Sequence, residues 1–505
     1  MASVSGEEAV AIEQNAEYLG VSLQQLMECA GTAVADVVAS RMKPDSKCVI
    51  LAGTGRNGGD GMVAARHLAA QGVKVELVLV GPEERITDVN TKRNWECVKR
   101  MVQSLKTSVV RDSALLPDIE ADVVVDALLG IGIRGKLTPP TSIAVQKINQ
   151  TSALKIAVDV PTGIDATLGA TSGEAVKADI TATFHRCKLG LEKASEYAGE
   201  VVVADIGVPP EAELYAGPGD VNIIKKTRPS ASHKGDFGRV LIIGGSETFV
   251  GAPTLAGLAA LKSGVDLVYV AAPKQTALAI SQYTPDLITV KLSGEHLVKG
   301  DVAYLESYLK KTSAVVFGMG LGLHRETAEA VKAVLAAVES VKVPMVLDAD
   351  GLKIYSEMKH TPSVKWVLTP HAGEFQILTR EKVSENLEEA ADQVRKAAAD
   401  RNAIVLLKGP VDIISDGSQV KFNYAGNPGM TVGGTGDVLA GLVGGFIALG
   451  ADPFHASVAA AFVNGVTGDL LYAEKGYHIL PTDLLDYIPR VIENPTLRAS
   501  PVALG

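Results

Sequence analysis

The sequence predicts two consecutive α/β domains, and three observations lead to this prediction. At 505 residues the chain is too long for one domain core, which usually holds about 100–200 residues. Apolar residues make up 47% of the chain and charged residues 21%, a balance typical of globular rather than disordered proteins. Short apolar segments alternate with helix-like segments through both halves, as expected of open, largely parallel sheets.

The first half begins with two predicted helices over residues 7–42. From Lys47 onward the strand-like segments KCVILAG and VKVELVLVG flank the helical segment GMVAARHLAAQ. The segments ADVVVDALLG and ALKIAVDVPTG then repeat a buried strand that ends in a polar, glycine-containing loop. Because ligands of parallel sheets bind at the carboxyl ends of the strands, these loops are the candidate binding positions.

The alternating pattern lapses around residues 211–232, where Pro, Gly and mixed charge replace it. We therefore predict domains at residues 1–215 and 229–505, joined by a linker at 216–228. RVLIIGG restarts the strand pattern, and AVVFGMGLG, PMVLDADGL, WVLTPHAGEF and IVLLKGP follow as strand-to-loop transitions. KGPVDIISDGSQVKFNYAG predicts a β-hairpin with a DG turn. The apolar stretch 438–450 is too short for a bilayer and predicts a buried helix.

The charge pattern excludes some classes of partner. The net charge of −10 argues against a nucleic-acid-binding surface. The N-terminus is acidic and has no apolar signal core, so we expect a cytoplasmic protein without a membrane partner. The four cysteines form no CxxC pair and no metal pattern with histidine, so reduced thiols are expected at Cys29, Cys48, Cys97 and Cys187.

A glycine-rich loop, GTGRNGGDG at residues 53–61, directly follows a predicted strand and opens a helix. Glycines let the backbone approach a phosphate, and the free N–H groups of a helix N-terminus attract anions. A tight turn would also need glycine. Five glycines together with Asn57 and Asp60 favour a binding site over a plain turn.

Two aspartates end the strands that follow. Asp126 closes VVVDALLG, and burial of an unpaired carboxylate there is costly, which favours a functional site. Asp159 closes KIAVDV ahead of PTG, where a role in capping the turn stays open. In GIGIRGK, Arg134 and Lys136 could hold a phosphate, although an ordinary solvated loop is equally expected.

These three motifs, in this order, resemble the NAD(P)H-hydrate epimerase domain over about residues 7–215. The resemblance implies a Rossmann-like three-layer αβα domain in which Asp159 contacts the hydrated nicotinamide and transfers protons. The implied substrate-binding residues are Asn57, Gly58, Gly59, Asp60, Gly61, Gly130, Ile131, Gly132, Ile133, Arg134, Gly135, Lys136 and Asp159. It also implies that Asn57, Asp126 and Thr162 bind a potassium ion, and their amide, carboxylate and hydroxyl oxygens are hard donors suited to alkali cations.

The strongest motif of the second half is GNPGMTVGGTGDVLAGLVGG at residues 426–445. Gly433, Gly434 and Gly436 would offer backbone N–H groups at a helix N-terminus, a preorganised site for a phosphoryl group. Asp437 could take a proton from a hydroxyl that attacks the phosphate. An N-cap is the alternative role for Asp437, and the surrounding glycines favour the site. The pattern resembles ribokinase-like small-molecule kinases.

Further loops narrow the resemblance to the ADP/ATP-dependent NAD(P)H-hydrate dehydratases, over about residues 229–492: SHKGDFGRVLIIGGS, FGMGLG, VLDADGL, LTPHAGEF and LLKGPVDII. The resemblance implies a ribokinase-like αβα domain that phosphorylates the hydrate hydroxyl with help from Asp437. The implied nucleotide-binding residues are Lys408, Gly409, Pro410, Val411, Asp412 and Gly436. The implied contacts to the hydrated substrate are Ala252, Gly320, His371 and Asp437.

Some positions depart from the family pattern or stay open. This chain has HAGEF, GMGLG and GGTGD where the family often has HPGE, GPGLG and GGSGD, which leaves the fine geometry of these loops undecided. Asp348 and Asp350 could bind Mg²⁺ or hold a turn, and the roles of His233 and Lys234 are open.

Together the motifs predict an enzyme that interconverts the R and S forms of NADH hydrate and NADPH hydrate and dehydrates the S form. By resemblance it uses ADP (or ATP), Mg²⁺ and K⁺ and forms a homo-oligomer. One alternative is a kinase of a vitamin-type alcohol with an N-terminal nucleotide-metabolite-binding module, which rests on GGTGD alone. Another is a non-enzymatic N-terminal domain that acts as an NAD-metabolite or RNA-associated binding module, with only the C-terminal half catalytic. The presence of Asp159 with three oxygen donors favours an active N-terminal domain.

Overall fold

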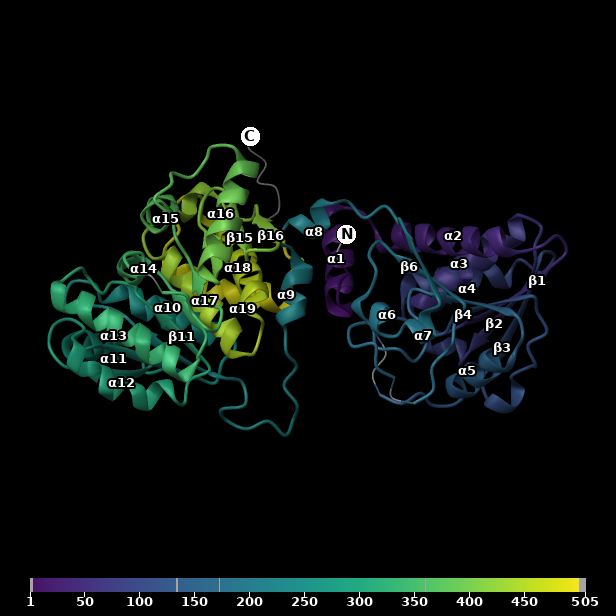
Figure 1. The fold of residues 1–505 in the computed structure, drawn as a ribbon, viewed down its shortest axis with the longest axis horizontal. Coiled ribbons are helices and arrows are strands. Elements are labelled where there is room, and N and C mark those ends of the chain that lie inside the picture. The colour runs from purple at the N-terminus through teal and green to yellow at the C-terminus, as the bar shows by residue number, and fades with distance from the viewer. Residues whose placement is uncertain (1–2, 133–134, 172, 359, 499–505) are drawn as a thin grey trace. The chain divides into compact units, whose positions relative to one another are not determined.

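The computed structural model describes residues 3–132, 135–171, 173–358 and 360–498 (Figure 1). The chain divides into two compact units, Met1–Pro210 and Glu211–Gly505, and each is described by itself. Ile133 and Arg134, two of the predicted substrate contacts, lie outside the described residues.

The described part of the first unit is built around one parallel sheet with the strand order β3-β2-β1-β4-β5-β6-β7. This is the order of a Rossmann-type sheet, as predicted. The strands are β1 (Lys47–Ala52), β2 (Lys74–Val80), β3 (Leu105–Val110), β4 (Val123–Ala127), β5 (Leu154–Val158), β6 (Ile180–Phe184) and β7 (Glu200–Ala204). The helices are α1 (Gly6–Leu19), α2 (Leu23–Arg41), α3 (Arg56–Ala70), α4 (Val89–Lys99), α5 (Thr141–Gln150), α6 (Leu189–Lys193) and α7 (Ser195–Ala198), and the 3-10 turns are η1 (Glu83–Arg85) and η2 (Ser113–Leu115).

Helices cover both faces of this sheet. A Cβ on Gly61 of α3 would lie 2.5 Å from the Cβ of Ala127, so α3 lies directly against one face. On the other face, Val49 and Leu51 of β1 form one buried cluster with Val145 of α5. Burial on both faces explains the continuous Val and Ile runs of the strands. The two helices predicted over residues 7–42 are confirmed as α1 and α2.

The described part of the second unit holds a larger, mixed sheet with the order β10-β9-β8-β11-β12-β13-β14-β15-β16. Its strands are β8 (Arg239–Ile243), β9 (Leu267–Pro273), β10 (Ile288–Leu292), β11 (Ala314–Phe317), β12 (Met345–Leu347), β13 (Val367–Leu368), β14 (Ile404–Leu407), β15 (Asp412–Ser415) and β16 (Val420–Asn423). Its helices are α8 (Glu211–Leu214), α9 (Pro218–Ile224), α10 (Gly251–Lys262), α11 (Lys274–Tyr283), α12 (Val302–Leu309), α13 (Arg325–Val341), α14 (Ala349–Tyr355), α15 (Ala372–Thr379), α16 (Leu387–Arg401), α17 (Thr435–Ala448), α18 (Pro453–Lys475) and α19 (Pro481–Glu493), with 3-10 turns η3 (Lys299–Asp301) and η4 (Pro428–Met430).

Two helical layers enclose the second sheet. A Cβ on Gly444 of α17 would lie 2.2 Å from Val316 Cγ2, so α17 lies against the face that carries Val240 and Val316. The opposite face carries Leu241 and Phe317, which share one buried cluster with residues of α12, α13, α14 and α16. The apolar stretch predicted as a buried helix is confirmed as α17, in which every residue from 438 to 448 is buried.

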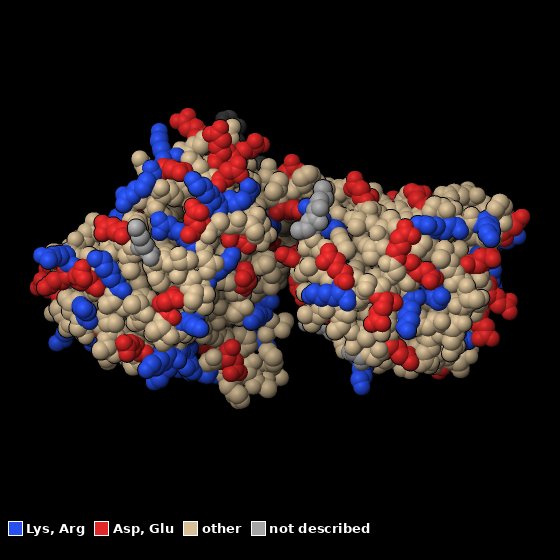
Figure 2. Space-filling view, in the orientation of Figure 1, with Lys and Arg blue, Asp and Glu red and all other residues tan. Residues whose placement is uncertain are grey.

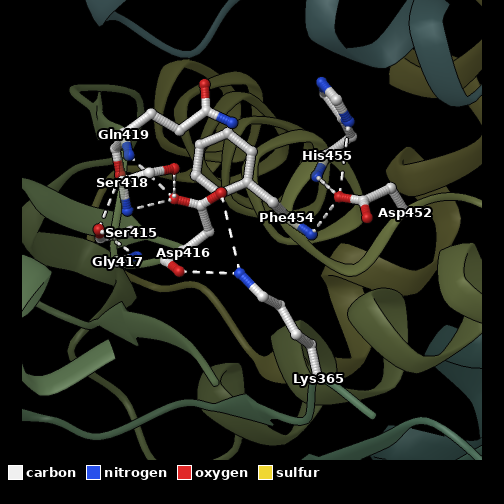
Figure 3. A network of polar contacts seen from close by, with 9 residues as sticks. All are labelled: Lys365, Ser415, Asp416, Gly417, Ser418, Gln419, Asp452, Phe454 and His455. Atoms are coloured by element: carbon white, nitrogen blue, oxygen red, sulfur yellow. Dashed lines mark hydrogen bonds and ion pairs between the residues drawn. The ribbon is translucent and has the colours of Figure 1, made fainter. Parts of the chain in front are cut away.

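The predicted hairpin with a DG turn is confirmed as β15 and β16, which pair antiparallel. Asp416 organises the turn: its Oδ1 accepts hydrogen bonds from the N–H groups of Ser418 at 2.8 Å and Gln419 at 2.9 Å (Figure 3). Lys365 Nζ donates to the Asp416 carbonyl oxygen at 2.9 Å. Burial alone would raise the pKa of Asp416, but the hydrogen bonds from Gln419 and Ser418 to its carboxylate, together with the nearby charge of Lys365, keep the pKa below its usual value.

The segment predicted as a linker is structured differently from the prediction. Residues 216–228 include α9, which falls in the second unit, and Asp220 of this helix is buried with its Oδ1 2.6 Å from Lys421 Nζ. The Pro and Gly residues at 217–219 favour a loop in the sequence. In the structure Pro218 occupies the first turn of α9, where proline is well tolerated.

Charged side chains of both signs are interspersed over the face shown in Figure 2. Within the described ranges, no helix combines the length and the apolar character needed to cross a membrane. All four cysteines carry free thiols, and Cys48 is buried.

Candidate functional sites

The glycine-rich loop of the first unit leads from β1 into α3, and Asn57 lies in the first turn of that helix. Close backbone approach requires glycine at two positions of this loop: a Cβ on Gly53 would lie 1.9 Å from the Leu128 carbonyl oxygen, and one on Gly58 would lie 1.9 Å from the Gly53 carbonyl oxygen. Asn57 is buried, and its Nδ2 has no hydrogen-bond partner among the described residues. Since a buried polar group without a partner is costly, this amide is a candidate ligand-binding group.

Asp126 and Thr162 meet at the ends of β4 and β5, as the sequence predicts for neighbouring parallel strands. Asp126 Oδ1 accepts a hydrogen bond from Thr162 Oγ1 at 2.7 Å, and Oδ2 accepts one from the Thr162 N–H at 2.8 Å. Both residues are buried. Burial raises the pKa of Asp126 to about 6, although its hydrogen bonds to Thr162 and Leu128 oppose the shift.

Asp159 follows β5 and does not cap its own turn. Its Oδ1 lies 2.5 Å from Lys188 Nζ and 3.0 Å from Thr183 Oγ1. Lys188 also donates to the Phe184 carbonyl oxygen at 2.9 Å. Asp159 has a φ of 63°, in the left-handed region that non-glycine residues rarely adopt, and such strain clusters at functional positions.

Asn57 and Asp159 line one cavity of about 640 Å³, whereas Asp126 and Thr162 are not among the described residues that line it. Its lining combines the glycine-rich loop, the loop after β4, Asp159 and helix α1: Gly53, Gly55, Asn57, Asp60, Gly130, Ile131, Gly132, Gly135, Lys136, Asp159, Val10 and Glu13. The structure therefore brings together Asn57, Asp60, Lys136 and Asp159 as predicted from their motifs. The motifs did not indicate Glu13 or Lys188, because neither lies in a glycine-rich or strand-end segment.

The second unit gathers charged groups at the carboxyl ends of β12 and β14. Lys408 Nζ lies 2.9 Å from Asp348 Oδ1, which also accepts a hydrogen bond from Thr369 Oγ1 at 2.8 Å. Burial lowers the pKa of Lys408, but the carboxylates of Asp348, Glu374 and Asp437 outweigh it and raise the pKa above its usual value. The structure thus places Asp348, left open by the sequence, beside Lys408.

Asp437 lies in the first turn of α17 without capping it, since the N-cap residue is Gly434 and no side chain caps the helix. Burial raises the pKa of Asp437 to about 7, repulsion from Asp348 adds to this, and Lys408 opposes it. A Cβ on Gly436 would lie 3.5 Å from Lys408 Nζ, so the helix N-terminus and the lysine adjoin the same space. A pKa near neutrality suits a group that takes up a proton at physiological pH.

The predicted substrate contacts fall in two places. Gly320, with a φ of 64°, would bring a Cβ within 3.6 Å of the Ala252 Cβ, so these two residues are neighbours. His371 precedes α15 and its Nδ1 accepts a hydrogen bond from the Gly373 N–H at 3.0 Å, so it caps the helix while its side chain stays largely exposed. The backbones of His371 and Lys408 are neighbours, because the two residues form an isolated parallel β-bridge.

Two further predicted positions have local roles. Asp412 of the KGPVD segment accepts hydrogen bonds from the Gly409 N–H at 3.1 Å and from Asn423 Nδ2 at 3.0 Å, so it fixes the loop that follows β14. Burial raises its pKa to about 6. Asp350 accepts a hydrogen bond from the Gly322 N–H at 3.0 Å and pairs with Lys353, so it holds the FGMGLG loop.

His233 and Lys234 lie in an exposed loop before β8, where the His233 N–H donates to Asp236 Oδ2 at 2.7 Å. No described contact joins either side chain to Asp437 or Lys408. Nor do the described residues contain a cluster of three or more His, Cys, Asp or Glu side chains arranged to hold a metal.

Comparison with known proteins assigns both units. The family described as YjeF-related protein N-terminus matches residues 23–190, and the family described as NAD(P)H-hydrate dehydratase matches residues 240–490. Among solved structures, a hypothetical protein from Streptococcus mutans is 28% identical, with a TM-score of 0.51 over 56% of this chain and 100% of that chain. A ribokinase-like superfamily protein from Enterococcus faecalis is 26% identical, with a TM-score of 0.50 over 55% of this chain and 95% of that chain. The ribokinase-like fold predicted for the second unit is confirmed.

Curated relatives match almost the whole chain. Proteins named bifunctional NAD(P)H-hydrate repair enzyme Nnr are 44% identical in Hyperthermus butylicus, over 99% of this chain and 94% of that protein, and 44% identical in Pyrobaculum aerophilum, over 97% and 98%. The relative of the same name in Archaeoglobus fulgidus is 42% identical over 97% of this chain and 99% of its own length. The chain therefore belongs to the family of bifunctional NAD(P)H-hydrate repair enzymes.

Proposed function

We propose that this chain repairs hydrated NADH and NADPH in two steps. The first unit interconverts the R and S hydrates, and the second unit dehydrates the S form at the expense of ADP or ATP. The observation that carries the proposal is that one chain holds both the Asp159 cavity and the Asp437–Lys408 cluster. A kinase of a vitamin-type alcohol would account for neither the first cavity nor the likeness of the whole chain to bifunctional relatives.

In the first unit, the two loops that line the cavity would hold the substrate phosphates. The N–H groups of the first turn of α3, up to that of Gly58, favour anions, and Lys136 adds a positive charge, whereas the Gly59 N–H already donates to the Gly55 carbonyl oxygen at 3.2 Å. Asp159 would contact the hydrated nicotinamide. Its ion pair with Lys188 holds the carboxylate in place at the cavity wall, where it can serve as a proton acceptor.

A potassium ion fits the residues at the end of β4. Asn57, Asp126 and Thr162 would supply amide, carboxylate and hydroxyl oxygens, which suit a hard monovalent cation. The buried Asp126 carboxyl has no cationic partner among the groups that shift its pKa, so a bound cation would compensate its charge. The cation would hold the loop after β4 in place and would supply no proton.

In the second unit, Lys408, Gly409, Pro410, Val411, Asp412 and Gly436 would hold the nucleotide. Lys408 and the N–H groups of α17 would face its phosphates, and Mg²⁺ carried with the nucleotide would neutralise phosphate charge near Asp348. Asp437 takes the proton of the hydrate hydroxyl while that oxygen bonds to the terminal phosphorus and the nucleotide leaves. Loss of the phosphate together with a proton from the neighbouring ring carbon then restores the double bond.

We propose that Ala252, Gly320 and His371 position the hydrated ring for this reaction, and that the enzyme works in the cytoplasm as a homo-oligomer on these small molecules. Size-exclusion chromatography with light scattering tests the assembly.

The function is tested with purified protein, an epimeric mixture of NADH hydrate, Mg²⁺, K⁺ and either ADP or ATP, followed by the absorbance of NADH. We expect both epimers to be consumed. Consumption of the S form alone would remove the epimerase half of the proposal, and no NADH from either epimer would remove all of it.

A further inference from the structure

Helix α1 contributes an acidic side chain to the cavity of the first unit. Glu13 lines this cavity together with Asn57, Asp60 and Asp159, and it also lines a small adjoining cavity with Asp60 and Phe184. The charges that face Glu13 come from Asp159, Lys188 and Arg56, and Glu13 in turn acts on the carboxyl of Asp60. Glu13 therefore belongs to the same electrostatic environment as the proposed catalytic aspartate.

The two carboxyls differ in their partners. Asp159 is ion-paired with Lys188 at 2.5 Å, whereas the Glu13 carboxyl forms no hydrogen bond or ion pair with the part of the chain that the structure describes. Asn57, which lines the same cavity, is more than nine-tenths buried with an unpartnered Nδ2. Unpartnered polar groups on one cavity wall point to a polar ligand in that space.

Their electrostatic surroundings also differ. Burial raises the pKa of Glu13 to about 7, and the charge of Asp159 adds to this shift, while Lys188 and Arg56 oppose it. Burial likewise raises the pKa of Asp60 well above its usual value, and repulsion from Glu13, Asp159 and Asp88 adds to it, while Arg56 opposes it. Glu13, a carboxyl without a partner among the described residues, and the ion-paired Asp159 line the same cavity, and such different environments are what acid and base roles in a single site need.

We propose that Glu13 is the acid of the epimerisation and that Asp159, in the same cavity, is the base. The proposal rests on the proposed epimerase function of the first unit and deepens it by naming a second catalytic residue. It stands on the shared cavity, the free carboxyl of Glu13 and the ion pair that holds Asp159.

The proposed epimerisation breaks and re-forms the C–O bond of the hydrated ring carbon. Glu13 gives its proton to the hydroxyl oxygen on the hydrated ring carbon while that C–O bond breaks, water leaves, and the lone pair of the ring nitrogen forms a C=N bond. Water adds to the opposite face, the electron pair returns to nitrogen, and Asp159 takes the released proton. Proton transfer from Asp159 back to Glu13 through water restores the site.

The experiment measures epimerisation of the purified R hydrate, without nucleotide, by chromatographic separation of the epimers. For E13Q we expect kcat to fall about 100-fold or more with KM within threefold, because only the acid is lost. The matched control is E17Q, one helical turn further along α1 on an exposed residue, for which we expect kcat within twofold of the wild type. Dehydration of the S hydrate should be unchanged in both variants.

The pH profile supplies a second readout. Because Glu13 must carry its proton, kcat/KM of the wild type should fall above pH about 7, by about tenfold per pH unit. The residual activity of E13Q should lack this alkaline limb, and E13D should keep it at a lower rate.

The outcomes separate the two proposals. A wild type that leaves the R hydrate unchanged overturns the epimerase function itself. An active wild type with E13Q within threefold of it overturns only the role of Glu13. A wild-type profile without an alkaline limb overturns that role even if E13Q fails to fold. Loss of the limb in D60N, with the limb kept in E13Q, would make Asp60 the acid instead and likewise overturn it.

Discussion

Lys188 Nζ lies 2.5 Å from Asp159 Oδ1, and the two side chains are only 3% and 9% exposed. Both charges have been taken out of water, and Asp159 also has a left-handed backbone. A buried ion pair is weak evidence for added stability, because desolvation consumes much of the Coulomb attraction. The pair is better explained as a device that positions an ionised Asp159 at the cavity wall.

Lys188→Met should therefore damage both stability and epimerisation. It leaves the Asp159 carboxylate buried without its cation, which should lower the free energy of unfolding by about 3–5 kcal/mol. Urea unfolding measures the loss, and epimer interconversion should fall about 100-fold or more. The control is Lys193→Met, an exposed lysine of α6 whose Nζ donates to the Thr167 carbonyl oxygen at 3.0 Å, with an expected change of about 0.5 kcal/mol. Equal losses in the two variants would contradict the role of the pair.

The sequence could predict the sheets and the motif residues, but not every group that completes the first site. Runs of Val and Ile identify strands because burial on both faces demands them, and residues at their ends follow directly. Lys188 reaches Asp159 because β5 and β6 are neighbours, and Glu13 reaches the cavity from a helix. Such proximity depends on tertiary packing, which leaves no local pattern.

The sequence explains only in part why glycine is required in the two glycine-rich motifs. Gly58 is required because a Cβ would strike the Gly53 carbonyl, and Gly434 because its φ is 110°. The sequence indicates that glycine is needed but does not say whether a ligand, a turn or a neighbouring backbone requires it. Proline and glycine are likewise compatible with both a loop and a helix start, so the sequence predicts the segment that forms α9 as part of the linker.

Single substitutions should separate the two activities. Asp437→Asn removes the proposed base of the second unit, so dehydration should fall about 100-fold or more while R-to-S interconversion persists. Asp159→Asn should do the reverse, so that NADH forms from the S hydrate only. Chromatography of the epimers and NADH absorbance report the two reactions. If either variant lost both activities while its circular dichroism stayed native, the sites would not be independent.

The pH dependence of dehydration should follow the ionisation of Asp437. As a base it must lose its proton, so kcat/KM should rise with pH through about 7. Asp348→Asn removes the charge that raises this pKa and should move the limb to lower pH. Lys408→Met removes the charge that lowers it and should move the limb to higher pH. The test is the position of the limb rather than the rate, since both variants will also bind nucleotide less well; shifts of the same sign would contradict the assignment.

The N-cap of α17 should tolerate no side chain. A Cβ on Gly434 would lie 2.8 Å from Leu255 Cδ1 and 2.8 Å from Pro481 Cγ, at a φ of 110°. Gly434→Ala should lower the free energy of unfolding by about 1–3 kcal/mol and weaken nucleotide-dependent dehydration. Gly433→Ala is the matched stability control, because apart from its chain neighbours no described residue has an atom within 4 Å of its Cβ position. Thermal unfolding of the two variants measures the difference, and an equally stable Gly434→Ala would show that the helix start can shift without cost.

Removal of potassium should affect the first unit alone. Replacing K⁺ by tetramethylammonium should lower both the melting temperature and epimerisation, because the buried Asp126 carboxylate loses its compensating charge. A cation at 100 times its Kd would stabilise the native state by about 2.7 kcal/mol. Asp126→Ala should abolish this dependence on K⁺, and dehydration of the S hydrate should change little. A melting temperature independent of K⁺ in the wild type would contradict the site, because a cation bound only by the folded protein must stabilise it.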